Sequence, residues 1–294
     1  MQRVRVLHDH CPNHVEGSRD DTHACDMTSR PPTGALPEYE HPPVSEVALT
    51  VQLVDDIGFR SLDMATIAAC WEHDLPHVEE RDRLPRLDDD PDHLESKQDH
   101  TELHETPRLW LQNESGNHVL QLQQDRIAVN WSKSEADDDY PRYETIRDFL
   151  LEAWRRLEAK LADLGLTLPP PWMCQVMYVN ELGANHGWNS SADTVRLIAP
   201  WAGSMSDDFL PVDRHEGLLL HFHIPEHQGW MNIDGRTADI GTRILVLTLA
   251  SQGWPASPDL DGVLGFMDLA HEWIVKGFTS VTTPEAHQEW GRVR

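Results

Sequence analysis

The stretch VLQLQQDRIAVNWSK, residues 119–133, is the most regular part of the sequence and decides how the chain folds. Apolar and polar residues alternate on both sides of the segment QDR, as they do in strands that bury one face. The stretch therefore predicts two antiparallel strands joined by a tight turn. The residues predicted to face the core are Leu120, Leu122, Ile127, Val129 and Trp131.

The polar residues of this hairpin allow two interpretations. Gln123, Arg126 and Asn130 could form a polar binding surface on the side of the hairpin that faces away from the core. Alternatively, side-chain hydrogen bonds hold the turn at Asp125 and Arg126 together, because turn residues must meet specific backbone demands. The second interpretation is favoured, and the first is kept as a hypothesis.

Two long amphipathic helices follow two groups of predicted strands. Apolar residues recur at three- and four-residue spacings over residues 143–164, and a second helix is predicted over residues 259–278. Helices that are segregated from mostly antiparallel strands define an α+β protein. We expect a mostly antiparallel curved sheet, or two joined sheets, with the long helices packed on one face.

The N-terminal segment differs in composition from the rest of the chain. Residues 1–43 hold few large apolar residues and include the proline-rich stretch RPPTGALPEYEHPP, which predicts a disordered tail. Met27 stands where a short polar tail would begin. We therefore hypothesise that residues 1–26 are upstream sequence included by a wrong start assignment.

Residues 44–292 are predicted to form a single α+β domain, built from two halves at 44–168 and 172–292. Each half consists of strands followed by one long helix. Residues 76–106 are strongly acidic in the middle and are predicted to form a long surface loop.

The composition of the chain limits the kinds of partner that it could bind and the cellular compartment in which we expect it. The 50 acidic and 24 basic residues give a formal net charge of −26, which argues against a nucleic-acid surface built on phosphate neutralisation. No apolar run approaches the ~20 residues of a membrane-spanning helix. Neither a signal peptide nor a regular cysteine spacing is visible. We expect a cytoplasmic protein without membrane contact.

The stretch HFHIPEH contains candidate metal ligands. His221 and His223 are two residues apart on a predicted strand, so both rings point to one face, and His227 follows the turn. Such a pair can bind Zn²⁺ or another divalent metal. A third ligand could come from Glu226, Asp234 or His215. The alternative is an ordinary solvent-facing strand, because 18 histidines make chance pairs common.

Other candidates are less specific. The N-terminal residues His8, His10, Cys11, His14, His23 and Cys25 include metal-binding types, but their spacing matches no known zinc module. Trp188 and Trp201 lie at predicted loop positions. Loop tryptophans can line a ligand pocket or anchor a partner, and they can equally cover the open end of a sheet.

Several motifs resemble a known family. They are QLQQDRIAVNW, YPRYETIRDFL and AHEWIVKGFTSVTTPEAHQEWG, together with HPPVSEVALTVQL and VMYVNEL, and they span about residues 41–291. On these motifs the chain resembles a sporadically distributed bacterial and archaeal family of uncharacterised proteins. The resemblance implies no catalytic residue or cofactor. Patchy distribution is typical of defence, toxin–antitoxin and mobile-element genes, which suggests a component of such a system.

The sequence lacks the common nucleotide-binding and hydrolase motifs GxxxxGK[ST], GxGxxG and GxSxG. We therefore expect an intracellular protein-interaction module that meets an unidentified protein partner, and we predict no cofactor for it. One alternative is a metal-dependent hydrolase that uses His221 and His223. A second is a small-ligand binder of helix-grip type, in which a curved sheet wraps a long helix around an apolar cavity.

Overall fold

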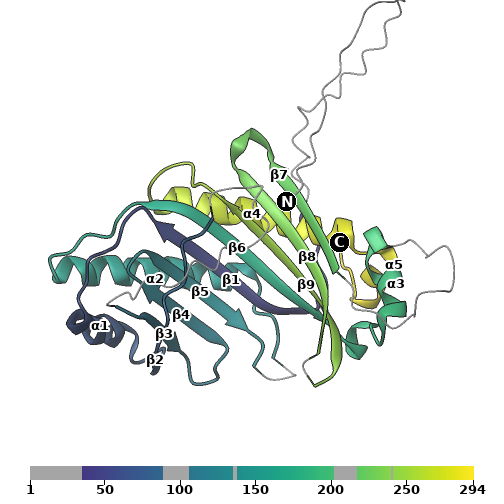
Figure 1. The fold of residues 1–294 in the computed structure, drawn as a ribbon, viewed down its shortest axis with the longest axis horizontal. Helices are drawn as coiled ribbons and strands as arrows, with labels where there is room; N and C mark the ends of the chain where they lie inside the picture. Colours follow the sequence, from purple (N-terminus) through teal and green to yellow (C-terminus); the bar gives the residue numbers. More distant parts are fainter. Residues whose placement is uncertain (1–34, 89–105, 135–137, 202–216, 240) are drawn as a thin grey trace, which may run out of the picture. The chain divides into compact units, whose positions relative to one another are not determined.

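The computed structural model describes residues 35–88, 106–134, 138–201, 217–239 and 241–294. Residues 36–294 form one compact unit around a nine-stranded sheet in the order β2-β3-β4-β5-β1-β6-β9-β8-β7, and every neighbouring pair is antiparallel. The predicted α+β class with a mostly antiparallel sheet is confirmed (Figure 1).

The strands are β1 (Val44–Leu53), β2 (His77–Arg81), β3 (Arg108–Gln112), β4 (His118–Gln123), β5 (Arg126–Ser132), β6 (Pro171–Leu182), β7 (Gly217–Ile224), β8 (Gly229–Asp239) and β9 (Arg243–Gly253). The α-helices are α1 (Ser61–Ala68), α2 (Tyr143–Asp163), α3 (Thr194–Leu197), α4 (Leu260–Val281) and α5 (Pro284–Glu289). No helix among the described residues is long and apolar enough to span a membrane.

The two long helices, α2 and α4, pack on the same face of the sheet (Figure 1). Both helices bury residues at three- and four-residue spacings, such as Ile146, Leu150 and Leu157 in α2, and this places one apolar stripe against the strands. Alternate residues of the strands are apolar and face these helices, including Leu49 of β1 and Val129 of β5. The opposite side of the sheet is called the helix-free face below.

The two halves of the chain supply the two sides of one continuous sheet. Each half runs through a strand, a short helical segment, a meander and a long helix, and the meander has four strands in the first half and three in the second. Strands β1 and β6 lie together at the centre, where Leu49 pairs with Val176. Beyond β1 follow β5, β4, β3 and the additional edge strand β2, and beyond β6 follow β9, β8 and β7. The element order is therefore repeated about the central strand pair.

Two parts of the chain differ from the sequence prediction. Residues 77–81 lie in the predicted acidic loop but form edge strand β2, whose five residues are all exposed. An edge strand without a buried face has no alternating pattern, and its charged side chains protect the edge from further pairing. Residues 89–105 of that loop are outside the described residues.

The predicted tail also ends earlier than expected. Residues 36–43 belong to the compact unit, and Tyr39 is buried there, with its ring against those of Phe278 and Trp290. One aromatic residue among prolines and polar residues creates no periodicity, so the sequence pattern did not indicate this contact. Residues 1–34 are outside the described residues.

Candidate functional site

The quoted hairpin forms strands β4 and β5, and its two faces are those predicted. Leu122 pairs with Ile127 on the side of the long helices, and Gln121 pairs with Ala128 on the helix-free face. The pair formed by Gln123 and Arg126 closes a two-residue turn. The hairpin prediction is confirmed.

The turn is held by hydrogen bonds to neighbouring parts of the chain rather than by a primed backbone conformation. Positive φ angles at described non-glycine residues occur only at Arg142 and Glu226, so Gln124 and Asp125 do not form the primed turn that matches strand twist best. Instead, the Gln124 amide accepts a hydrogen bond from the Gly58 N–H at 2.9 Å and donates to the Phe59 carbonyl at 2.5 Å. These bonds fasten the turn to the chain that follows β1.

Residues 82–88, called the crossing segment here, are held next to this turn by polar side chains of the sheet. The Gln123 amide donates to the Leu84 carbonyl at 3.1 Å and accepts from the Leu84 N–H at 3.1 Å. Arg126 donates to the Pro85 carbonyl. Both side chains therefore form hydrogen bonds with the backbone of the crossing segment.

The same type of contact continues along the crossing segment. Gln52 of β1 accepts a hydrogen bond from the Leu87 N–H at 3.4 Å. Gln252 of β9 donates to the Asp88 carbonyl at 2.5 Å. Side chains from β4, β5, β1 and β9 thus hold the backbone of one polypeptide segment at one end of the sheet. The segment itself is half-exposed or exposed, whereas Gln52 and Gln123 are fully buried.

An ion cluster at Asp125 fastens the crossing segment further. The carboxylate, which is 2% exposed, lies 3.0 Å from the Arg83 guanidinium and 3.2 Å from that of Arg86. Burial raises the pKa of the Asp125 carboxyl, but the hydrogen bond from Gln123 and the charge of Arg83 outweigh it, so the pKa lies below its ordinary value. Burial lowers the pKa of Arg126 to about 10, which leaves this residue charged at neutral pH.

The predicted binding residues of the hairpin therefore have partners within the chain. Gln123 and Arg126 hold the crossing segment. Asn130 accepts a hydrogen bond from Gln121 at 2.7 Å and donates to Glu46 at 2.9 Å, on the helix-free face. The buried position of all three residues favours the structural interpretation of the hairpin.

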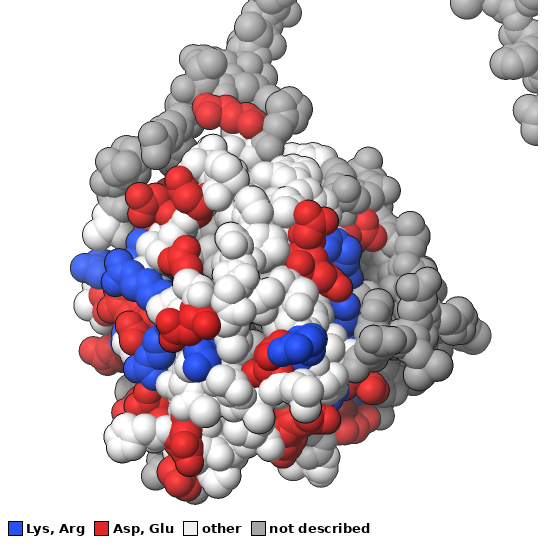
Figure 2. Space-filling model, turned by 90° about the vertical axis from the view of Figure 1, so that its left-hand side faces the viewer, with Lys and Arg blue, Asp and Glu red and all other residues white. Residues whose placement is uncertain are grey.

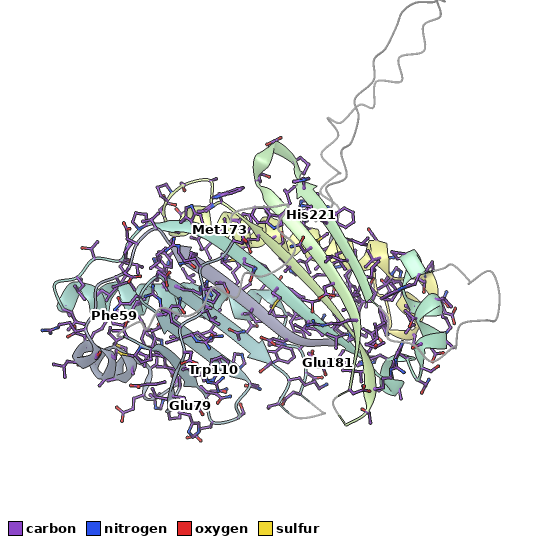
Figure 3. All side chains as sticks on the ribbon, in the orientation of Figure 1. Phe59, Glu79, Trp110, Met173, Glu181 and His221 are labelled. Carbon is purple, nitrogen blue, oxygen red and sulfur yellow. The ribbon has the colours of Figure 1, made fainter. Side chains whose placement is uncertain are left out.

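Half-exposed residues continue the helix-free face across β6, β9 and β8. The surface they form is called the open surface, and its members are Gln175, Met177, Val179, Thr248, Ala250, Asn232 and Asp234. It mixes small, polar and apolar side chains. At the far end of β6, near Glu181 (labelled in Figure 3), a shallow depression is lined by Ser45, Glu46, Ser132, Lys133, Ser134, Val179 and Glu181. The alternating pattern of β6 was the sequence signal for this surface.

The predicted loop tryptophans lie on the other side of the sheet. Trp188 is completely buried in the core, and its indole N–H donates to the Thr194 hydroxyl at 3.0 Å. Trp201 is half-buried and packs against the same core, close to Gly235. The structure thus gives Trp188 a core position, because the chain after β6 folds back over the hydrophobic layer.

The predicted histidine pair is brought together on β7. The ring centroids of His221 and His223 are 4.9 Å apart. Among the described residues, no group of three or more histidine, cysteine or acidic residues is placed to hold a metal ion. His215 and the N-terminal set of histidines and cysteines are outside the described residues, as is the side chain of His227.

A second buried polar network lies between β6 and the long helices. The hydroxyl of Tyr178 is 2.8 Å from that of Tyr140 and 3.0 Å from Nδ1 of His271. The rings of His271 and Tyr143 stack at 4.0 Å, and the Tyr143 hydroxyl donates to Asp268. Burial lowers the pKa of His271 to about 4, although the neighbouring acidic groups Glu144 and Asp268 oppose this shift.

Charges on the described surface are interspersed at the end that carries α1. Figure 2 shows basic and acidic side chains side by side around an uncharged centre. Arg156 forms ion pairs with Asp74 and Glu152, and Arg60 pairs with Asp63. The acidic excess of the chain is therefore not presented as one continuous patch in this view.

Comparison with known proteins found distant likeness among solved structures. No family model and no curated protein matches the chain. Among solved structures, the chain is similar to DynU16, a protein of the dynemicin biosynthetic locus, at 13% identity and a TM-score of 0.26, over 80% of this chain and 97% of that one. A likeness at this level indicates neither a shared fold nor a shared function.

Proposed function

We propose that this chain is a protein-interaction module whose helix-free face binds an extended segment of a partner polypeptide. One observation carries the proposal: the same face already holds the crossing segment, residues 82–88, through the backbone groups of that segment. Contacts to backbone N–H and C=O groups supply affinity for a polypeptide whatever its sequence.

The open surface supports the proposal because it continues the face that carries the crossing segment. Thr248 and Asn232 offer hydrogen-bonding groups on this surface, and Met177 and Val179 offer apolar contact. Methionine is adaptable and is frequent at surfaces that bind varied polypeptides. A partner segment laid beside the crossing segment would meet polar side chains next to apolar ones.

A more specific part of the proposal concerns the cellular system in which the module acts. The resemblance to a sporadically distributed family supports an intracellular role in a defence or toxin–antitoxin type system. The partner would then be encoded next to this gene. Co-expression of the neighbouring genes with this chain tests the point, and the absence of a complex with each of them would count against it.

The binding surface is tested by purification from the native host. We expect a stoichiometric protein partner to accompany the wild-type chain and a Glu158→Lys control, whose substitution lies on the exposed side of α2. The partner should be lost from a Met177→Lys/Ala250→Lys double variant that remains folded. Equal recovery of the partner with both variants would refute the helix-free face as the binding surface.

A further inference from the structure

The proposed polypeptide binding does not explain the arrangement of the histidine pair on β7. His221 and His223 alternate with Phe222, so both rings lie on the helix-free face, at the outer edge of the sheet (Figure 3). Their centroids are 4.9 Å apart and the ring planes are inclined by 83°. His223 is exposed and His221 is half-buried.

A hydrogen bond fixes the tautomer of His221. Nδ1 lies 2.6 Å from Oδ1 of Asn232, which is the residue directly opposite it on β8. Because an amide oxygen only accepts, Nδ1 donates this hydrogen bond, and in the neutral ring Nε2 carries the lone pair. Nε2 is buried and has no hydrogen-bond partner within the part of the chain that the structure describes. A buried polar atom without a partner points to a missing one.

We propose that His221 and His223 form a two-histidine site for a divalent transition metal such as Zn²⁺. Neutral imidazole is a preferred ligand of such ions, and metal-binding histidines almost always donate their second ring N–H to an oxygen, as His221 does to Asn232. Water molecules complete the coordination. The site is independent of the proposed polypeptide binding.

The test follows the histidine rings by NMR in the full chain labelled with ¹⁵N-histidine. Zn²⁺ is the probe, and its free concentration is set by a metal buffer. The His221→Ala and His223→Ala variants assign the two rings. Because each histidine gives its own signal, zinc bound elsewhere in the chain does not confuse the readout. His77, an exposed histidine on β2, is the internal control.

The Nε2 signal of His221 should shift with zinc, and the His223 ring should shift at the same free concentration while His77 does not. The His223→Ala substitution should raise the zinc concentration needed for the His221 shift at least tenfold. Asn232→Leu should raise it by about 10- to 100-fold, and Asn232→Asp should restore binding. An unchanged His221 signal in millimolar zinc, or an identical shift in the His223→Ala variant, would overturn the site.

Discussion

The side-chain amide of Gln123 forms both hydrogen bonds that a backbone would form with Leu84, one to its N–H and one to its carbonyl. The Gln123 side chain is 1% exposed, so these two hydrogen bonds lie beneath the crossing segment and not at its edge. The polar residues of the hairpin therefore bind the backbone of residues 82–88. We propose that the open surface binds a partner polypeptide in a similar way.

Removing this amide should release the crossing segment. A Gln123→Ala variant loses three hydrogen bonds, two with Leu84 and one to Asp125, and should reduce the free energy of unfolding by about 3 kcal/mol. Urea denaturation measures the loss, and limited proteolysis should show faster cleavage within residues 82–88. The control is Gln288→Ala, at an exposed position of α5, which should change stability by less than about 0.5 kcal/mol. Unchanged cleavage in Gln123→Ala would show that other contacts hold the segment.

Neutralising Asp125 should be more costly than removing Gln123. The Asp125→Asn substitution leaves the buried Arg126 without its neighbouring negative charge and removes one of the two carboxylates that pair with Arg83, the other being Asp56. Breaking a buried ion pair costs about 3–5 kcal/mol. The matched control is Glu79→Gln, since the ion pair between Glu79 and Arg81 is exposed and should contribute about 1 kcal/mol or less. Urea denaturation that gives equal losses for both variants would contradict the role of Asp125.

The contribution of Asp125 should depend on pH in one direction. Its pKa in the folded protein lies below the ordinary value of 3.8, so the ionised form stabilises the fold. This contribution is complete above about pH 4 and is lost as the pH falls through the folded pKa. The stability difference between the wild type and Asp125→Asn should therefore shrink from pH 5 towards pH 2.5. A constant difference over this range would show that the carboxylate charge is not involved.

His271 should make the fold sensitive to milder acid. Its pKa of about 4 in the folded state lies below the ordinary value of 6.5, so protonation favours the unfolded chain. Stability from this group is complete above pH 6.5 and falls by up to about 3 kcal/mol as the pH drops towards 4. A His271→Gln variant should lose less stability over this range in urea denaturation. Parallel curves for the variant and the wild type would contradict the assignment.

Trp188 should behave as a core residue and not as a binding residue. Trp188→Ala removes a completely buried ring and should cost about 3–5 kcal/mol of unfolding free energy. Trp254→Ala, at an indole that is 38% exposed, should cost clearly less. Thermal and urea unfolding compare the two variants. Similar losses would mean that Trp188 does not have the core position described here.

The parts of the fold that sequence reasoning predicted well are those with a strong period. Strands β4 and β5 alternate strictly around their turn, and α2 repeats its apolar residues every three or four positions. Each pattern arises because one face of the element packs against the apolar core, although the opposite face of β4 and β5 is buried as well and carries mainly polar side chains. The α+β class followed from these elements and from the order in which they occur.

The remaining features depend on contacts between distant residues. Strand β2 has no buried face, so its charged sequence resembles that of a loop. Trp188 follows a glycine- and asparagine-rich stretch, and only the path of the chain back over the core buries it. The contact between Gln252 and Asp88 joins residues 164 positions apart, which no local pattern can indicate.

Site-specific photo-crosslinking tests the central claim most directly. A photoreactive amino acid is placed at position 177 on the open surface and, as a control, at position 158 on α2, in the native host. The proposed function predicts that a partner polypeptide is captured from position 177 and not from position 158. Capture from position 158 alone, or from both positions equally, would contradict binding at the helix-free face.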